Sequence, residues 1–138
     1  MIIDDWEKTM KIAKRVETEW AVLELTESGV LVFRYFKGVE LSETVARTVV
    51  AAGVELCGDL VPTPVLALLD EINGFTRGAQ KFFAESEENQ AASARVALVV
   101  SSPIAKVIAN FFMKLNKPRV PTRMFTDQAK AMTWLTRS

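Results

Sequence analysis

The sequence predicts a single α/β domain with a mixed, mostly parallel sheet and an antiparallel hairpin near its N-terminus. Two segments rich in β-forming residues, "WAVLEL" (20–25) and "VLVFRYF" (30–36), are separated by only a short loop, which favours a hairpin. Beyond them, apolar segments such as "VLALLD" (65–70) alternate with segments of helical periodicity. Such alternation is typical of parallel strands joined by right-handed crossovers. A length of 138 residues suits one domain spanning the chain.

The N-terminal segment, residues 1–19, is the least regular part of the pattern. Trp6, Met10 and Ala13 follow the spacing i, i+4, i+7, so we expect a short helix there. In the hairpin that follows, Gly29 is available for the positive φ that a tight loop needs.

The first long helix is expected to begin after Ser42 and to stop near Gly58. Ser42 is a good N-cap, and glycine commonly ends a helix. Its expected core face comprises Val45, Val49, Ala52 and Leu56.

The segment "VLALLD" is apolar almost throughout, as expected for a strand covered on both faces. A second helix is predicted from Thr76, with Ala79, Phe82 and Phe83 facing inward. The polar stretch "AESEENQAAS" (84–93) then reads as a solvated helix face and loop.

After the strand "ARVALVV" (94–100), Pro103 marks a helix start, because proline suits the first helical position. Phe112 and Met113 lie off the expected core stripe of this helix, so they are either the candidate interface of a homodimer or buried against the N-terminal segment. A short strand "TRMF" (122–125) and a closing helix (126–135) complete the domain. The expected core stripe comprises Ile104, Val107, Ile108, Phe111 and Leu115.

Composition excludes several classes of function. The chain has no histidine, which removes His-based catalysis and metal sites, and its 17 basic residues balance 17 acidic ones, which argues against nucleic-acid binding. Its single cysteine, Cys57, lies in an apolar stretch and suits a reducing compartment. No apolar run is long enough to span a membrane, and the acidic start does not resemble a signal peptide, so we expect a cytoplasmic protein. No catalytic group, metal-ligand spacing or phosphate loop is recognisable, so we expect neither enzymatic activity nor a cofactor.

The segments "VLALLDEINGFTRGAQKFF", "RVALVVSSPIAKVIANFFMKLNKPRVPTRMFTD" and "AMTWL" resemble the STAS-like superfamily, whose best-known members are bacterial anti-anti-sigma factors. The chain is most similar to small bacterial STAS-like proteins of unknown function. The resemblance covers roughly residues 20–135 and implies a SpoIIAA-like fold. In phospho-regulated members, a serine after the equivalent of "VLALLD" is phosphorylated. Thr76 stands in its place, but Phe75 replaces the usual preceding acid and Arg77 follows.

Thr76 therefore has two interpretations: a helix cap, or a phosphoacceptor that the resemblance implies. A threonine cap stabilises a helix by roughly 1 kcal/mol without any regulatory role. We favour the cap.

The carboxyl ends of parallel strands also define a candidate rim for a small ligand or anion. Thr76 and Ser102 precede helices, whose free N–H groups attract anions, although capped helices in a solvated rim explain the same residues. Lys114, Lys117 and Arg119 form, with Arg123, a basic stretch that could bind phosphate or an acidic partner or be plain solvated surface. The candidate rim comprises Asp70, Thr76, Ser101, Ser102 and Arg123.

These observations favour a non-enzymatic STAS-like interaction or regulatory module that docks a protein partner or a second copy of itself. The alternative is a small-molecule or lipid-binding domain of the Sec14-like type, to which STAS-like folds are often likened. An internal apolar cavity would distinguish the two.

Overall fold

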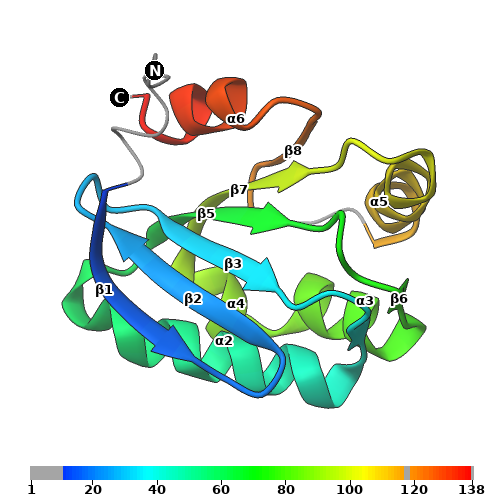
Figure 1. Ribbon diagram of the computed structural model, residues 1–138. Helices are drawn as coiled ribbons and strands as arrows, with labels where there is room; N and C mark the ends of the chain where they lie inside the picture. Colours follow the sequence, from blue (N-terminus) through cyan, green and yellow to red (C-terminus); the bar gives the residue numbers. More distant parts are fainter. Residues whose placement is uncertain (1–10, 117–118, 138) are drawn as a thin grey trace.

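The computed structural model describes residues 11–116 and 119–137. Six strands form one twisted sheet in the order β1-β2-β3-β5-β7-β8, and helices cover both of its faces (Figure 1). Along the chain the elements are β1 (Ile12–Glu17), β2 (Ala21–Thr26), β3 (Leu31–Tyr35), β4 (Glu40–Leu41), α2 (Glu43–Cys57), the 3-10 helix η1 (Gly58–Leu60), β5 (Thr63–Leu68), β6 (Gly74–Phe75), α3 (Arg77–Glu85), α4 (Glu87–Ala92), β7 (Ser93–Val99), α5 (Pro103–Asn116), β8 (Thr122–Phe125) and α6 (Gln128–Leu135).

The predicted fold class is confirmed. β2 and β3 form the antiparallel hairpin, and Gly29 in its loop has φ of 86°. From β3 onward the neighbours β3, β5, β7 and β8 are all parallel. The central strand β5 has buried residues facing both ways: Leu66 packs in the cluster that includes α6, and Ala67 packs in the larger cluster on the opposite face. The uniform apolar character of "VLALLD" follows from this position.

The predicted N-terminal helix is wrong where the structure describes it. Residues Ile12–Glu17 form β1, which pairs antiparallel with β2 and occupies the edge of the sheet. Ala13 is therefore in a strand, whereas Trp6 and Met10 lie outside the described residues. Pairing with β1 gives hydrogen-bond partners to the backbone groups along the outer edge of β2. The charged residues of β1, now the edge strand, oppose edge-to-edge aggregation.

The helix α2 begins and ends as predicted. Val45 N–H donates to the Ser42 hydroxyl (3.3 Å), and Gly58 closes the helix with φ of 54°. A Cβ at Gly53 would lie 2.9 Å from a methyl group of Leu31, so this glycine lets α2 lie close to the sheet. Cys57, at the last turn, is buried in the same core.

The predicted core face of α2 is half right. Val45 and Val49 are buried, whereas Ala52 and Leu56 are only half-buried. The polar stretch after α3 is also more ordered than predicted, because α4 forms there with Ser86 as its N-cap.

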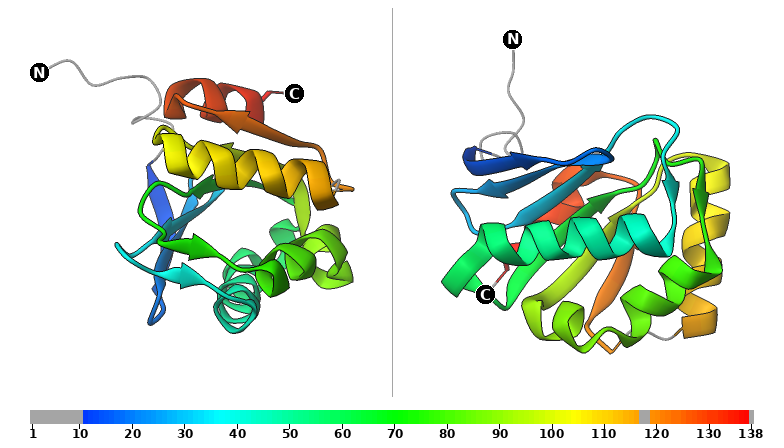
Figure 2. Two further views of the ribbon diagram at one scale, coloured as in Figure 1. Left: turned by 90° about the vertical axis from the view of Figure 1, so that its right-hand side faces the viewer. Right: turned by 90° about the horizontal axis from the view of Figure 1, so that it is seen from below.

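The helices are unevenly distributed over the sheet. Figure 2 shows α6 on one face and α2, α3 and α4 on the other, while α5 crosses beside the carboxyl ends of β5 and β7. The short parallel pair β4-β6 holds the start of α2 beside the start of α3. In the part of the chain that the structure describes, no helix is long and apolar enough to cross a membrane.

Candidate functional site

The structure brings three of the predicted rim residues together at the start of α5. Asp70 follows β5, and Ser101 and Ser102 follow the adjacent β7. One Asp70 carboxylate oxygen accepts from the backbone N–H groups of Ser101 (2.8 Å) and Ser102 (3.1 Å), and the other accepts from the Ser101 hydroxyl (2.5 Å). Ser102 in turn caps α5, since its hydroxyl accepts from the N–H of Ala105 (3.1 Å).

This geometry sets the charge state of Asp70. Partial burial alone would raise its pKa, but the hydrogen bonds from Ser101 and Ser102, with the nearby charge of Lys106, outweigh burial and lower the pKa below its ordinary value. Asp70 is thus a carboxylate at neutral pH. It occupies the position at the N-terminus of α5 where an external anion would bind, so this rim is already filled by the chain's own anion.

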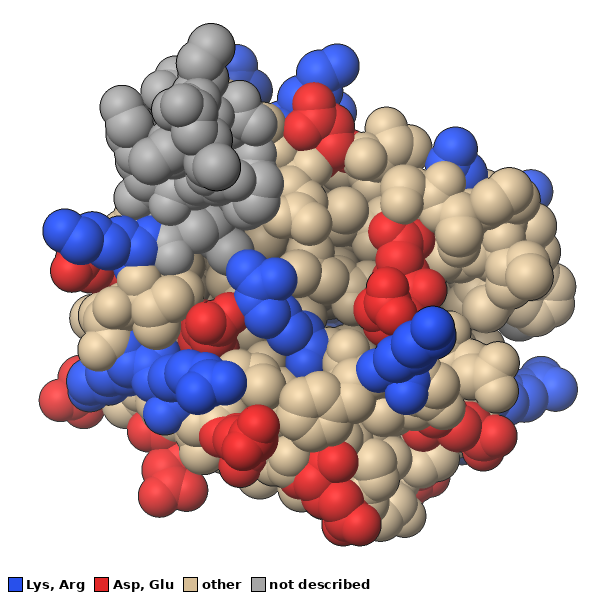
Figure 3. All heavy atoms as spheres, in the orientation of Figure 1, with Lys and Arg blue, Asp and Glu red and all other residues tan. Residues whose placement is uncertain are grey.

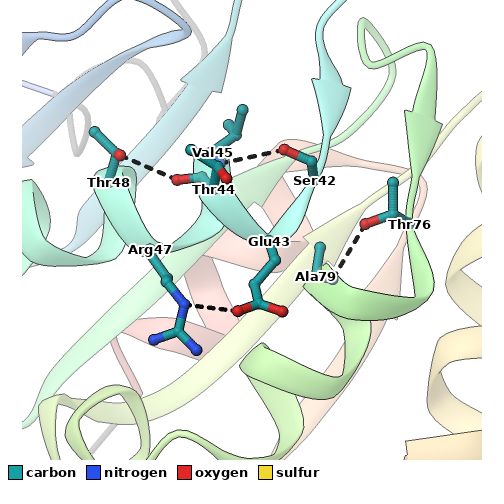
Figure 4. A network of polar contacts seen from close by, with 8 residues as sticks. All are labelled: Ser42, Glu43, Thr44, Val45, Arg47, Thr48, Thr76 and Ala79. Atoms are coloured by element: carbon teal, nitrogen blue, oxygen red, sulfur yellow. Dashed lines mark hydrogen bonds and ion pairs between the residues drawn. The ribbon is translucent and has the colours of Figure 1, made fainter.

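The cap interpretation of Thr76 is confirmed. Its side-chain oxygen accepts from the N–H of Ala79 (3.2 Å) at the start of α3 (Figure 4). A Cβ at Gly78 would lie 3.3 Å from a carboxylate oxygen of Glu43 and 4.0 Å from the Thr76 hydroxyl, so an acid of α2 already lies near this helix start. A phosphate on Thr76 would add negative charge beside that acid and disturb the cap.

Arg123 lies apart from the rim. Its guanidinium carbon is 5.3 Å from the ring centroid of Phe125 and 5.5 Å from that of Trp134. Phe125 and Trp134 pack on the face of the sheet that α6 covers. Arg123 therefore makes cation–π contacts with an outer layer of the domain and does not join Asp70, Ser101 and Ser102.

The predicted faces of α5 are reversed. Phe112 is only 5% exposed and stacks on Phe75 with ring centroids 5.4 Å apart, so it belongs to the core and is not an interface residue. Met113 is half-buried against the same core. The residues of α5 that face inward with Phe112 are Ala105 and Ala109.

The opposite face of α5 is apolar and exposed. Ile104 is 75% exposed, Val107 67% and Phe111 58%. Their spacing of i, i+3 and i+7 places them in one line, which we call the α5 outer face. Figure 3 shows the region over α5, at the right of the view, as largely uncharged, with both basic and acidic groups at its border.

The two lysines Lys106 and Lys114 are exposed on the same helix, which carries no acidic residue. The alanines Ala105 and Ala109 were the signal that sequence reasoning missed, because small residues allow a helix to approach its neighbours closely. Leu115 was also assigned to the core stripe, but its side chain lies outside the described part of the structure.

An apolar pocket of about 70 Å³ lies between the sheet and the helices α3, α4 and α5. One end of it is lined by aromatic and aliphatic side chains, including Phe75, Phe83 and Phe112. At this end burial raises the pKa of the Tyr35 hydroxyl, which keeps it un-ionised. The other end is lined by Ser93 and Arg119. No single sequence segment predicts this pocket, because nine different elements and the segments that connect them form its walls.

The described residues contain no cluster of three or more acidic or cysteine side chains able to hold a metal ion. Two ion pairs join described residues, Arg34 with Glu24 and Arg47 with Glu43, and both are partly exposed. Neither is in the pocket.

The family model described as "Domain of unknown function (DUF7793)" matches residues 24–138. A search of the curated proteins found no match. The chain is also similar to a solved structure from Shewanella loihica PV-4, an uncharacterized protein from the DUF3478 family with a SpoIIAA-like fold. That match has 16% sequence identity and a TM-score of 0.50, and covers 91% of this chain and 94% of the other.

A second solved structure, a protein with unknown function from Arthrobacter sp. FB24, is 29% identical over 89% of this chain and 98% of its own, with a TM-score of 0.34. The similarity to the Shewanella structure agrees with the SpoIIAA-like fold that the sequence predicts.

Proposed function

Because the chain belongs to the family described as Domain of unknown function (DUF7793) and has a SpoIIAA-like structural neighbour, we propose that it is a non-enzymatic interaction module of a bacterial cytoplasm. Its docking surface is the α5 outer face. One observation carries this proposal: three large apolar side chains, Ile104, Val107 and Phe111, are exposed in one line along a single helix.

The energetic argument rests on the cost of that exposure. Fully burying a valine, isoleucine or phenylalanine side chain gains roughly 1.5–3 kcal/mol relative to leaving it in water. Single exposed apolar residues are common on protein surfaces, but a continuous apolar line is typical of a contact surface. At about 1.5 Å per residue, the 14 residues of α5 extend about 21 Å, which suits one helix-to-helix contact.

We propose a second copy of the chain as the occupant of the α5 outer face. A two-fold axis would pack this face against itself, as symmetric dimers do. The formal net charge of +0 leaves little long-range repulsion between copies. A different protein with an apolar surface and acidic border is the second candidate, since Lys106 and Lys114 are exposed on the same helix.

Sedimentation velocity of the full chain over a range of concentrations tests this proposal. Wild type should shift from monomer to dimer as concentration rises, and Phe111→Glu should remain monomeric with an unchanged circular dichroism spectrum. Leu60→Glu is the matched control, because Leu60 is an equally exposed apolar residue (57%) in η1, outside α5. That control should dimerise like wild type. A wild type that stays monomeric at high micromolar concentration would exclude self-association through this face.

A further inference from the structure

The apolar pocket has two chemically different ends. Its apolar end is closed by an aromatic cluster in which Phe75 contacts Phe83 edge-on, with centroids 5.9 Å apart, and stacks on Phe112. Its polar end lies where β7 and β8 begin and is lined by Asn89, Gln90, Ser93, Arg119 and Thr122. Pockets that are mostly apolar with a few polar groups at one place are typical of small-molecule sites.

The Ser93 hydroxyl is the first group at the polar end that could bind a ligand. Ser93 is only 8% exposed, and none of the side-chain hydrogen bonds among residues 11–116 and 119–137 involves its hydroxyl. This hydroxyl is not one of the fully enclosed side-chain atoms without a partner, so it reaches the open space of the pocket that Ser93 lines. The Ser93 hydroxyl is therefore available to donate to a molecule in the pocket.

The Arg119 guanidinium is the second group at the polar end that could bind a ligand. It is exposed at the mouth of the pocket, and its Nη1 donates to the side-chain oxygen of Gln90 at 3.4 Å. Within residues 11–116 and 119–137, no carboxylate forms an ion pair with it. The Gln90 side chain is itself held by a hydrogen bond from its amide to the carbonyl oxygen of Ala84.

We propose that this pocket binds a short-chain aliphatic monocarboxylate, with its tail against the aromatic cluster and its carboxylate between Arg119 and Ser93. Guanidinium and hydroxyl groups together suit the planar, acceptor-only carboxylate. Because roughly 10–15 Å³ of this kind of volume suffices for one water-sized group, a pocket of about 70 Å³ holds about five to seven such groups, so the enclosed tail is short. This site is independent of the docking proposed for the α5 outer face.

The test is a titration of the full ¹⁵N-labelled chain with hexanoate, followed by ¹H–¹⁵N spectra. Saturable shifts should be confined to amides lining the pocket, such as Ser93 and Leu98. Hexylamine, of equal tail length but opposite charge, should give no saturable shift, and hexanol should bind at least tenfold more weakly than hexanoate. Equal binding of hexanoate and hexylamine, or no saturable shift with millimolar hexanoate, would overturn the proposal.

Two variants locate the bound molecule. Arg119→Gln should weaken hexanoate binding at least tenfold, whereas Arg123→Gln, an exposed arginine on β8 that lies outside the pocket lining, should leave it unchanged. Ala67→Leu should fill the pocket and abolish binding, with Ala67→Val giving a smaller loss if the leucine variant does not fold. Hexanoate bound undiminished by both Arg119→Gln and the folded Ala67 variant would show that it binds elsewhere.

Discussion

Two carboxylates lie where an external anion would be expected to bind. Asp70 accepts from the first N–H groups before α5, and Glu43 lies close to the start of α3. Asp70 already supplies the favourable interaction of a negative charge with the N-terminus of α5, whereas Glu43 is ion-paired with Arg47 beside the start of α3. Anion binding at the start of α5 would therefore require displacement of the Asp70 side chain. At the residue scale, Asp70, Ser101 and Ser102 therefore stabilise the start of α5.

Thr76→Ala should lower the free energy of unfolding by about 1 kcal/mol, because it removes the acceptor for the Ala79 N–H. Thr76→Asn should restore most of this loss. Urea denaturation followed by circular dichroism measures both. Thr44→Ala, at an exposed threonine in the first turn of α2, is the control and should have little effect. Unchanged midpoints for both Thr76 variants would show that this hydroxyl contributes no cap.

Asp70 should make the stability of the protein depend on pH in the acidic range. Its folded-state pKa lies below the unfolded value of about 3.9, so its contribution is complete well above that pH and is lost as the pH falls through the folded pKa. Asp70→Asn should be less stable than wild type at pH 7, and the difference should shrink on acidification from about pH 5 to pH 2. Thermal unfolding across this range measures the effect.

Glu71→Gln, at the adjacent exposed carboxylate, is the control for loss of one surface charge and should show no such convergence. A constant difference between Asp70→Asn and wild type at all pH values would contradict the assigned role of Asp70.

At the element scale, α5 shows why an apolar pattern does not identify a buried face. Ile104, Val107 and Phe111 follow helical spacing, but so do Ala105, Ala109 and Phe112. Sequence reasoning chose the line with more apolar surface. The structure buries the other line, because alanines allow α5 to approach its neighbours while Phe112 fills the space beside Phe75. Which line of side chains faces inward depends on the shape of the surface of the domain against which α5 packs. The sequence of α5 alone does not determine that shape.

The adjacent phenylalanines of α5 give a direct test of this assignment. Phe112→Ala should destabilise the protein by about 3–5 kcal/mol, because it removes a buried ring. Phe111→Ala should cost less than about 1 kcal/mol, as exposed substitutions usually do. Equilibrium denaturation at a concentration where the protein is monomeric compares the two. Similar losses for both variants would show that both rings are buried.

The sequence does not predict β1, because this strand too is determined by a neighbouring element and not by its own pattern. Trp6, Met10 and Ala13 gave only three matches to a helical period, whereas the edge of β2 offers hydrogen bonds to any extended segment that reaches it. The other strands were predictable because their signals are stronger. The hairpin of β2 and β3 has a short loop with a glycine, and β5 and β7 are apolar runs followed by helix caps.

For the whole molecule, the sequence predicted the fold and the cap at Thr76 but not the pocket. Caps are local, since a hydroxyl and an N–H three residues apart are sufficient. The pocket is enclosed by side chains from β3 to β8 and from α3, α4 and α5 together. Its polar end contains both Ser93 and Arg119, which are 26 positions apart in the sequence. No sequence period relates such residues.

Hydrogen exchange should show the order of stability across the sheet. Amides of β5 should exchange most slowly, because β5 pairs with β3 and β7 on its two sides and is largely buried. Amides of β1 should exchange fastest among the strands of the main sheet, because β1 is an exposed edge. Mass spectrometry of peptides after timed deuteration measures this order. Protection of β1 equal to that of β5 would indicate that a partner chain covers this edge.

Alkylation of Cys57 can report transient opening of the protein at the end of α2. It is the single cysteine of the chain and is buried where α2 ends, and burial raises the pKa of its thiol although the Thr63 hydrogen bond and Lys14 act in the opposite direction. A buried, protonated thiol does not react with alkylating reagents. Every alkylation event therefore records one separation of the last turn of α2 from the sheet. The alkylation rate of Cys57 therefore measures how often this part of the wild-type protein opens, in a cell extract as well as in buffer, without any attached label.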